Sequence, residues 1–135
     1  MSTRTDHGGG CACGGVRYAI SGPLSAVTVC HCSICRRTSG HFAAMTAVPA
    51  AALTLLAEAS LTWFRSSEAA ERGFCGRCGG NLFWRPRSPD DQTIYVTAGT
   101  LDPPTGRRIG GHIFVADRSD YYRIPEDEPQ SDGWS

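Results

Sequence analysis

The most reactive stretch of the sequence is Cys30-His31-Cys32-Ser33-Ile34-Cys35, which places three cysteines and a histidine within six residues. Zinc prefers a tetrahedral set of Cys and His ligands, and this C-x-C-x-x-C spacing can bring three thiolates to one ion from a single loop. A structural zinc site normally has four protein ligands, whereas three ligands leave one position for water or substrate. The spacing therefore predicts an open metal site at Cys30, Cys32 and Cys35, here called the cysteine triad.

Four further cysteines form two short pairs, Cys11 with Cys13 and Cys75 with Cys78. A glycine follows the second cysteine of each pair, which suits a tight turn that directs backbone amides towards the sulfurs. The seven cysteines therefore divide naturally into four and three. The four would close one structural site that joins the start of the chain to its middle, although the spacing alone also allows other groupings.

The cysteine pattern also allows two other interpretations. Disulfides are typical of small secreted proteins, but seven cysteines is an odd number, no secretory signal is visible, and a C-x-C pair cannot easily bridge itself. Alternatively, both sites are structural, and His31, His41, His112 or a carboxylate completes the triad. His31 would more naturally point away from a metal that is held by its two neighbours.

Short strands separated by turn signals are expected on both sides of these cysteines. Alternating or apolar runs favour strands, and glycine and proline mark the turns between them. The expected strands are residues 16–20, 26–29, 42–48, 53–57, 61–65, 81–85, 94–98 and 112–116. A helical turn is expected over residues 33–39, with Gly40 ending it. The sequence predicts a mainly β domain of short antiparallel sheets clamped by zinc.

Length and charge exclude several classes of protein. The 135 residues suit one domain, and the 13 basic and 13 acidic residues give a formal net charge of zero. A chain with this balance has no net positive charge to bind nucleic acid or an anionic membrane. The uncharged run 42–57 is too short to span a bilayer. We expect a flexible N-terminus over 1–8, a folded domain over 9–124 and a loose acidic tail over 125–135. Reduced, metal-bound cysteines without a signal sequence favour the cytoplasm.

Several segments resemble the glutathione-dependent formaldehyde-activating enzyme (Gfa) family. The resemblance rests on GGCACGGVRY (9–18), CHCSICR (30–36) and FCGRCGGNLFW (74–84), with AGTLD (98–102) and HIFV (112–115) similar to later segments of that family. It implies a Mss4-like fold of β-sheets around zinc. It also implies a structural zinc at Cys11, Cys13, Cys75 and Cys78 and a catalytic zinc at the cysteine triad. The implied activity is that of an S-(hydroxymethyl)glutathione synthase, a carbon–sulfur lyase that joins formaldehyde to glutathione.

The same chemistry can be argued from the residues. A thiol adds to an aldehyde as its thiolate, and a zinc ion that accepts the incoming sulfur favours this form. Arg36 and Arg37 are candidates to hold substrate carboxylates, or else they balance the thiolates or face solvent. His31 and His112 are candidate proton donors to the adduct oxygen. The expected partners are two zinc ions, a small thiol such as glutathione and a small aldehyde; the alternative is a non-catalytic zinc module that binds glutathione or a protein.

Overall fold

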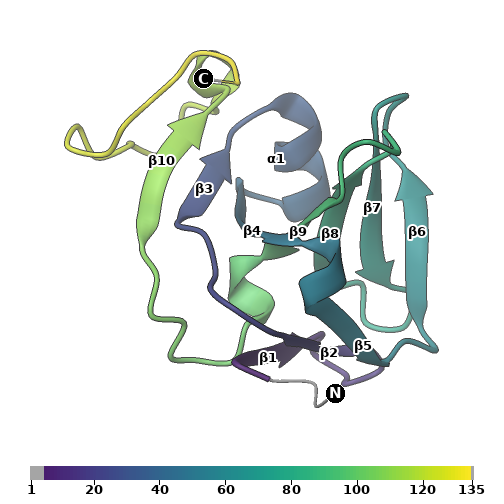
Figure 1. Ribbon diagram of the computed structural model, residues 1–135. Helices are drawn as coiled ribbons and strands as arrows, with labels where there is room; N and C mark the ends of the chain where they lie inside the picture. The colour runs from purple at the N-terminus through teal and green to yellow at the C-terminus, as the bar shows by residue number, and fades with distance from the viewer. Residues whose placement is uncertain (1–4, 135) are drawn as a thin grey trace.

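The computed structural model describes residues 5–134, and these form two β-sheets. The smaller sheet has the strand order β1-β2-β5 and the larger sheet the order β10-β3-β4-β9-β8-β7-β6. The small sheet lies at one end of the large sheet and the helix α1 lies towards the other end (Figure 1). The elements are β1 (His7–Gly10), β2 (Arg17–Ile20), β3 (Val27–Cys30), α1 (Ser33–Ser39), β4 (Ala43–Pro49), η1 (Ala50–Ala52), β5 (Leu53–Ala57), β6 (Leu61–Arg65), β7 (Ala70–Cys75), β8 (Asn81–Pro86), β9 (Thr93–Thr97), η2 (Ala98–Thr100), β10 (Ile109–Ile113) and η3 (Val115–Asp117). The prediction of a mainly β fold is confirmed.

One strand pair differs from the antiparallel pattern that was expected. The final strand, β10, runs parallel to β3, with Ile113 opposite Cys30. A parallel neighbour requires a long connection, and here the chain crosses from β9 to the far edge of the sheet through residues 98–108. This crossing places the end of the chain beside the strand that leads into the cysteine triad.

The core is formed by apolar side chains from both sheets. In β2 and β3 the buried positions include Tyr18, Ile20, Val27 and Val29, whose spacing of two puts each pair on one face of its strand. The main buried cluster contains Val16, Tyr18, Ile20, Leu24, Val48, Cys75, Leu82, Phe83, Ile94, Val96 and Leu101. This core packs the two sheets against each other, so that side chains from different sheets can share a site.

Two strands were not expected from the sequence. Residues 1–4 of the predicted flexible N-terminus lie outside the described residues, but His7 and Gly8 belong to β1 and pair with β2, so the prediction is wrong for them. Glycine is needed in this strand because a Cβ atom at Gly9 would overlap Tyr18 and the carbonyl of Thr100. The other unexpected strand is β7, which pairs with both β6 and β8.

The predicted loose tail is ordered over residues 125–134. The amide of His112 donates to the carbonyl of Pro129 (2.9 Å), and the amide of Ser131 donates back to the carbonyl of His112 (2.9 Å). The amide of Phe114 donates to the carbonyl of Gly133 (3.0 Å). The physical reason is that β10 is an edge strand whose backbone groups need partners, and this segment supplies them beside β10 (Figure 1).

Within the described part of the chain the single α-helix, α1, begins and ends as the sequence predicts. Cys32 is its N-cap residue, and Gly40 ends it in the left-handed conformation (φ 77°) with its amide donating to the carbonyl of Arg36. Among residues 5–134 the helices are all too short or too polar to cross a membrane.

Candidate metal centre and adjoining pocket

The cysteine triad is built on the junction between β3 and α1. Cys30 is the last residue of β3, Cys32 caps the helix and Cys35 lies in its first turn. The three sulfur atoms lie within 4.8 Å of one another. The amide of Cys35 donates to the sulfur of Cys32 (3.4 Å), which fixes the position of that sulfur at the start of the helix. A strand end followed at once by a helix therefore gathers three thiols from six residues.

Arg72 is a charged side chain in direct contact with the triad, and its role could not be predicted from the sequence. It is buried on β7, where Nη2 donates to the sulfur of Cys35 (3.5 Å) and Nη1 to the hydroxyl of Thr38 (3.4 Å). A hydrogen bond from Cys30, aided by the Arg72 guanidinium, lowers the pKa of Cys35 to about 5 despite its burial. The pKa of Cys30 is raised, mainly by the same hydrogen bond with Cys35 and secondly by burial. No motif in the sequence could have marked Arg72, because its position depends on a strand that was not predicted.

The four-cysteine cluster of Cys11, Cys13, Cys75 and Cys78 joins the two sheets. Its sulfurs also lie within 4.8 Å of one another, and the Cys11–Cys13 and Cys13–Cys75 sulfur distances are 3.7 and 3.6 Å. Four sulfurs at 2.3 Å from one tetrahedral zinc would be about 3.8 Å apart, so the cluster fits that ion. The pKa of Cys75 is lowered to about 5, mainly by its hydrogen bond with the Ser60 hydroxyl. Hydrogen bonds from the backbone amides of Cys78 and Arg77 lower it further. A sulfur that already favours the thiolate, as that of Cys75 does, is a suitable metal ligand.

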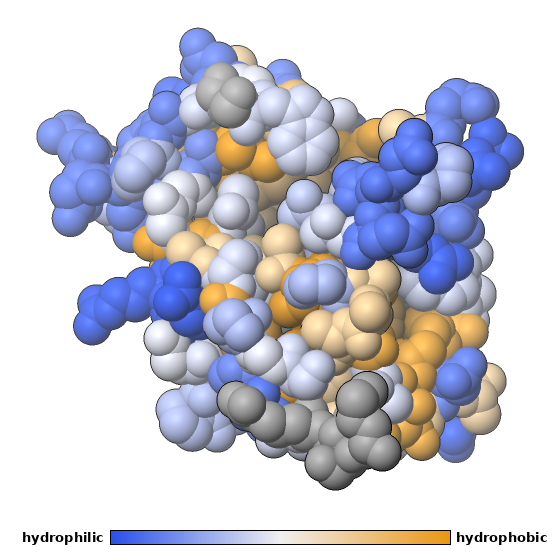
Figure 2. All heavy atoms as spheres, in the orientation of Figure 1, coloured by the Kyte–Doolittle hydropathy of each residue, from blue (hydrophilic) through white to orange (hydrophobic). Residues whose placement is uncertain are grey.

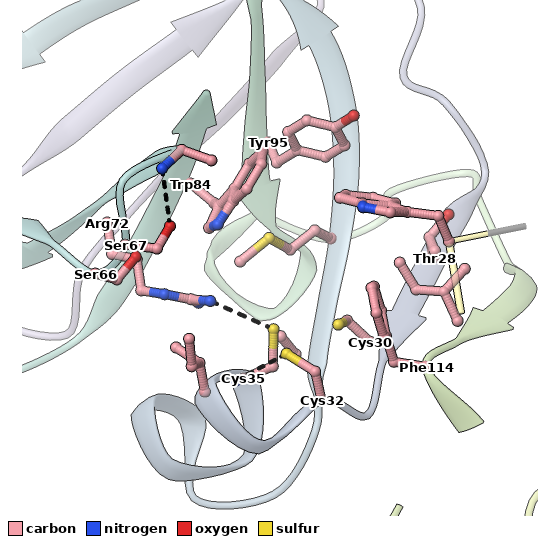
Figure 3. Close-up of a pocket in the computed structure, with 16 residues that line it drawn as sticks. Thr28, Cys30, Cys32, Cys35, Ser66, Ser67, Arg72, Trp84, Tyr95 and Phe114 are labelled. Carbon is pink, nitrogen blue, oxygen red and sulfur yellow. Dashed lines mark hydrogen bonds between the residues drawn. The ribbon is translucent and has the colours of Figure 1, made fainter. Parts of the chain in front are cut away.

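A pocket of about 460 Å³ opens beside the triad. All three triad cysteines line it, whereas none of the four-cysteine cluster does. Figure 3 shows Arg72 pointing towards Cys35 on one side of the pocket, with Trp84 and Tyr95 across from the triad. The lining residues are Thr28, Cys30, Cys32, Ile34, Cys35, Ala43, Met45, Ser66, Ser67, Ala69, Arg72, Trp84, Tyr95, Ile113, Phe114 and Trp134. The two clusters therefore differ in their access to a ligand-sized space.

The other predicted site residues lie outside the lining of this pocket. His31 is fully buried, with Nδ1 hydrogen-bonded to the Tyr122 hydroxyl and Nε2 2.9 Å from Nδ1 of His112. Nε2 of His112 lies 2.6 Å from a carboxylate oxygen of Glu128. Burial, together with the nearby His112, lowers the pKa of His31 to about 4. The three side chains and Tyr122 form a hydrogen-bonded chain behind the triad, which suits a structural role better than proton donation into the pocket.

The predicted roles of Arg36 and Arg37 gain no support from their positions. Both lie on α1, but neither lines the pocket beside the triad. His41, which was a candidate fourth ligand, is exposed and hydrogen-bonded to the Tyr121 hydroxyl instead. Among residues 5–134, no histidine is gathered with the three sulfurs. A metal ion held by the triad would therefore have only these three side chains as ligands from this group, and the pocket lies beside them.

Comparison with known proteins agrees with this arrangement. The model of the family "Glutathione-dependent formaldehyde-activating enzyme" matches residues 6–117. A Halomonas elongata protein, provisionally named as a glutathione-dependent formaldehyde-activating enzyme, is 29% identical over 134 residues, which cover 89% of this chain and 82% of that protein. A crystal structure of a Rhodobacter sphaeroides protein is similar with a TM-score of 0.58 and 25% identity, covering 71% of this chain and 88% of the other.

The fold and the site thus define a β protein with two cysteine clusters that could each hold a metal ion. The chain belongs to the glutathione-dependent formaldehyde-activating enzyme family, because the family match spans most of its length.

Proposed function

We propose that the protein is a zinc-dependent carbon–sulfur lyase, which joins a thiol such as glutathione to formaldehyde or a related small aldehyde in the cytoplasm. The observation that carries this proposal is the position of the cysteine triad. It offers three sulfur ligands and lines a pocket, whereas the four-cysteine cluster offers four and lies elsewhere. Three protein ligands suit a catalytic zinc and four suit a structural one.

A zinc ion at the triad would supply a soft, open coordination position that favours the thiolate form of a bound thiol. The chain itself supplies a buried positive charge, because the Arg72 guanidinium lies 3.5 Å from the sulfur of Cys35. In the reaction, the thiol sulfur forms a bond to the carbonyl carbon and the carbonyl π pair moves to oxygen. That oxygen takes up the proton that the thiol lost, so a thiol and an aldehyde give a hydroxyalkyl thioether. Ser67 and Tyr95 are among the lining residues, and their hydroxyls are the candidate donors to this oxygen.

The first test measures zinc content and catalysis on the same preparation. Protein purified without chelator is expected to hold two zinc ions per chain, and to accelerate the formation of S-(hydroxymethyl)glutathione from ¹³C-formaldehyde and glutathione, followed by NMR exchange spectroscopy. Cys32→Ser should lose one zinc and the acceleration. Ser33→Ala is the matched control, because Ser33 is the next residue along and is exposed.

One set of results for the wild-type protein would contradict the proposal. If wild-type protein keeps two zinc ions in glutathione, retains no glutathione and does not accelerate the reaction, the triad is a closed structural site. The non-catalytic zinc module would then be the better description.

A further inference from the structure

The pocket beside the triad is far more apolar than glutathione or formaldehyde would require. Four aromatic side chains line it, Trp84, Tyr95, Phe114 and Trp134, together with Ile34, Met45 and Ile113. Trp134 contacts Trp84 and Phe114 edge to face, with ring centroids 6.4 and 5.6 Å apart. On the face shown in Figure 2, apolar surface lies in the middle of the molecule and hydrophilic residues surround it.

The pocket offers few charged partners for glutathione. Arg72 is the only cationic side chain among its lining residues; its two terminal nitrogens donate to Cys35 and Thr38, and its buried Nε has no hydrogen-bond partner within residues 5–134. Glutathione carries two carboxylates and an ammonium group. Burying these groups without partners is unfavourable, so they should not occupy this space.

A second hollow of about 600 Å³ continues from the first and is more polar. The two share Ala69, Trp84, Tyr95 and Trp134, and the second adds Glu68, Arg87, Ser88 and Asp91. Charged and polar parts of a thiol could lie there while its sulfur reaches the triad. The apolar pocket beside the triad then remains for the group that the aldehyde adds to that sulfur.

Formaldehyde cannot fill this space, because it adds only one carbon and one oxygen to the sulfur. An apolar cavity of this size gains binding free energy when an apolar group displaces water from it. We propose that the aldehyde partner carries an apolar, aromatic substituent, which packs between Trp84, Phe114 and Trp134. This inference rests on the proposed function: the sulfur bonds to the carbonyl carbon of an aryl aldehyde, and the thiol proton ends on the carbonyl oxygen.

Stable thioethers that resemble the two adducts can test the inference by binding. S-benzylglutathione stands for the aryl adduct without its hydroxyl, and S-methylglutathione stands for the formaldehyde adduct. Isothermal titration calorimetry of the zinc-loaded protein should show S-benzylglutathione binding at least about tenfold more tightly, since a phenyl ring buries considerably more apolar area than a methyl group. S-(4-carboxybenzyl)glutathione adds a carboxylate to the same benzyl group, and it should lose most of that gain.

Trp134→Ala should weaken S-benzylglutathione binding about tenfold and leave S-methylglutathione within twofold. Trp134 is 61% exposed, so this variant should fold. Phe64→Ala is the matched control, because Phe64 is an exposed aromatic residue on β6 that does not line the pocket. Among aldehydes, benzaldehyde should give a larger kcat/KM with glutathione than formaldehyde in wild-type protein.

The outcomes separate this inference from the proposed function. If the protein accelerates formaldehyde addition but binds the benzyl and methyl thioethers equally, the inference is overturned and the proposed function stands. Equal binding of the benzyl and carboxybenzyl compounds would also overturn it, because the pocket would then not select apolar groups. If no aldehyde reaction is accelerated and no thioether binds, both proposals fail.

Discussion

Replacing each C-x-C pair with serines should destabilise the protein to very different degrees. The two double variants, Cys11→Ser with Cys13→Ser and Cys30→Ser with Cys32→Ser, change the same residue types at the same spacing. Each should remove one zinc ion. The first pair belongs to the cluster that joins the two sheets, whereas the second belongs to a stretch of six residues. We expect the first double variant to lose more of the free energy of unfolding.

The size of the difference follows from the lengths of chain that the two clusters close. Cys13 and Cys75 are 62 residues apart, whereas Cys30 and Cys35 are 5 apart. Loop-closure entropy grows as (3/2)RT ln n, so the two loops differ by about 2 kcal/mol. A triad within one short stretch can also hold metal in the unfolded chain, which reduces its contribution to folding. For a domain of this size, 2 kcal/mol corresponds to about 7 °C in Tm.

Urea denaturation and scanning calorimetry of the zinc-loaded proteins would measure this difference, with zinc content determined for each sample. Wild type and Ser33→Ala are the references. The reasoning would be refuted if both double variants lost one zinc ion and the same free energy of unfolding. It would also be refuted if the variant at Cys30 and Cys32 were the less stable of the two.

Two further predictions concern the core around Tyr18. Burial raises the pKa of Tyr18 to about 12 from an ordinary value of 10. The unfolded chain therefore loses this proton first, and the free energy of unfolding should fall between pH 10 and 12, by up to about 3 kcal/mol. Tyr18→Phe should remove this fall in urea titrations, and an unchanged slope in the variant would contradict the assignment. Gly9→Ala should cost roughly 1–3 kcal/mol, because its Cβ would overlap Tyr18. Gly99→Ala is its control, since a Cβ there meets nothing within 4 Å, and equal stability of the two variants would exclude the overlap.

The sequence was sufficient to predict the features that depend on local spacing. The division of seven cysteines into four and three agrees with the two clusters that the structure brings together. Alternating apolar residues also marked strands such as β2 and β3, and Gly40 marked the end of α1. These signals act over a few residues, so they can be read without knowing the tertiary structure.

The features that were missed depend on contacts between distant parts of the chain. β1 consists of His7 and three glycines, and it is a strand because β2 offers it a partner and Tyr18 leaves no room for side chains at Gly9. Arg72 reaches Cys35 across 37 residues of sequence, because β7 lies opposite α1. Neither feature has a local sequence pattern. Both depend on tertiary contacts, which override the weak strand propensity of the residues involved.

The C-terminal segment shows why the substrate does not follow from the family alone. Its acidic and proline-rich composition predicted a loose tail, but the hydrogen bonds of Phe114 and His112 hold it along the edge of β10. This attachment brings Trp134 into the lining of the pocket beside the triad. The family match ends at residue 117, so this wall of the pocket lies beyond the matched region. Under the two proposals, the cysteine clusters lie within the matched region, whereas Trp134, which would help to select the aldehyde, lies outside it.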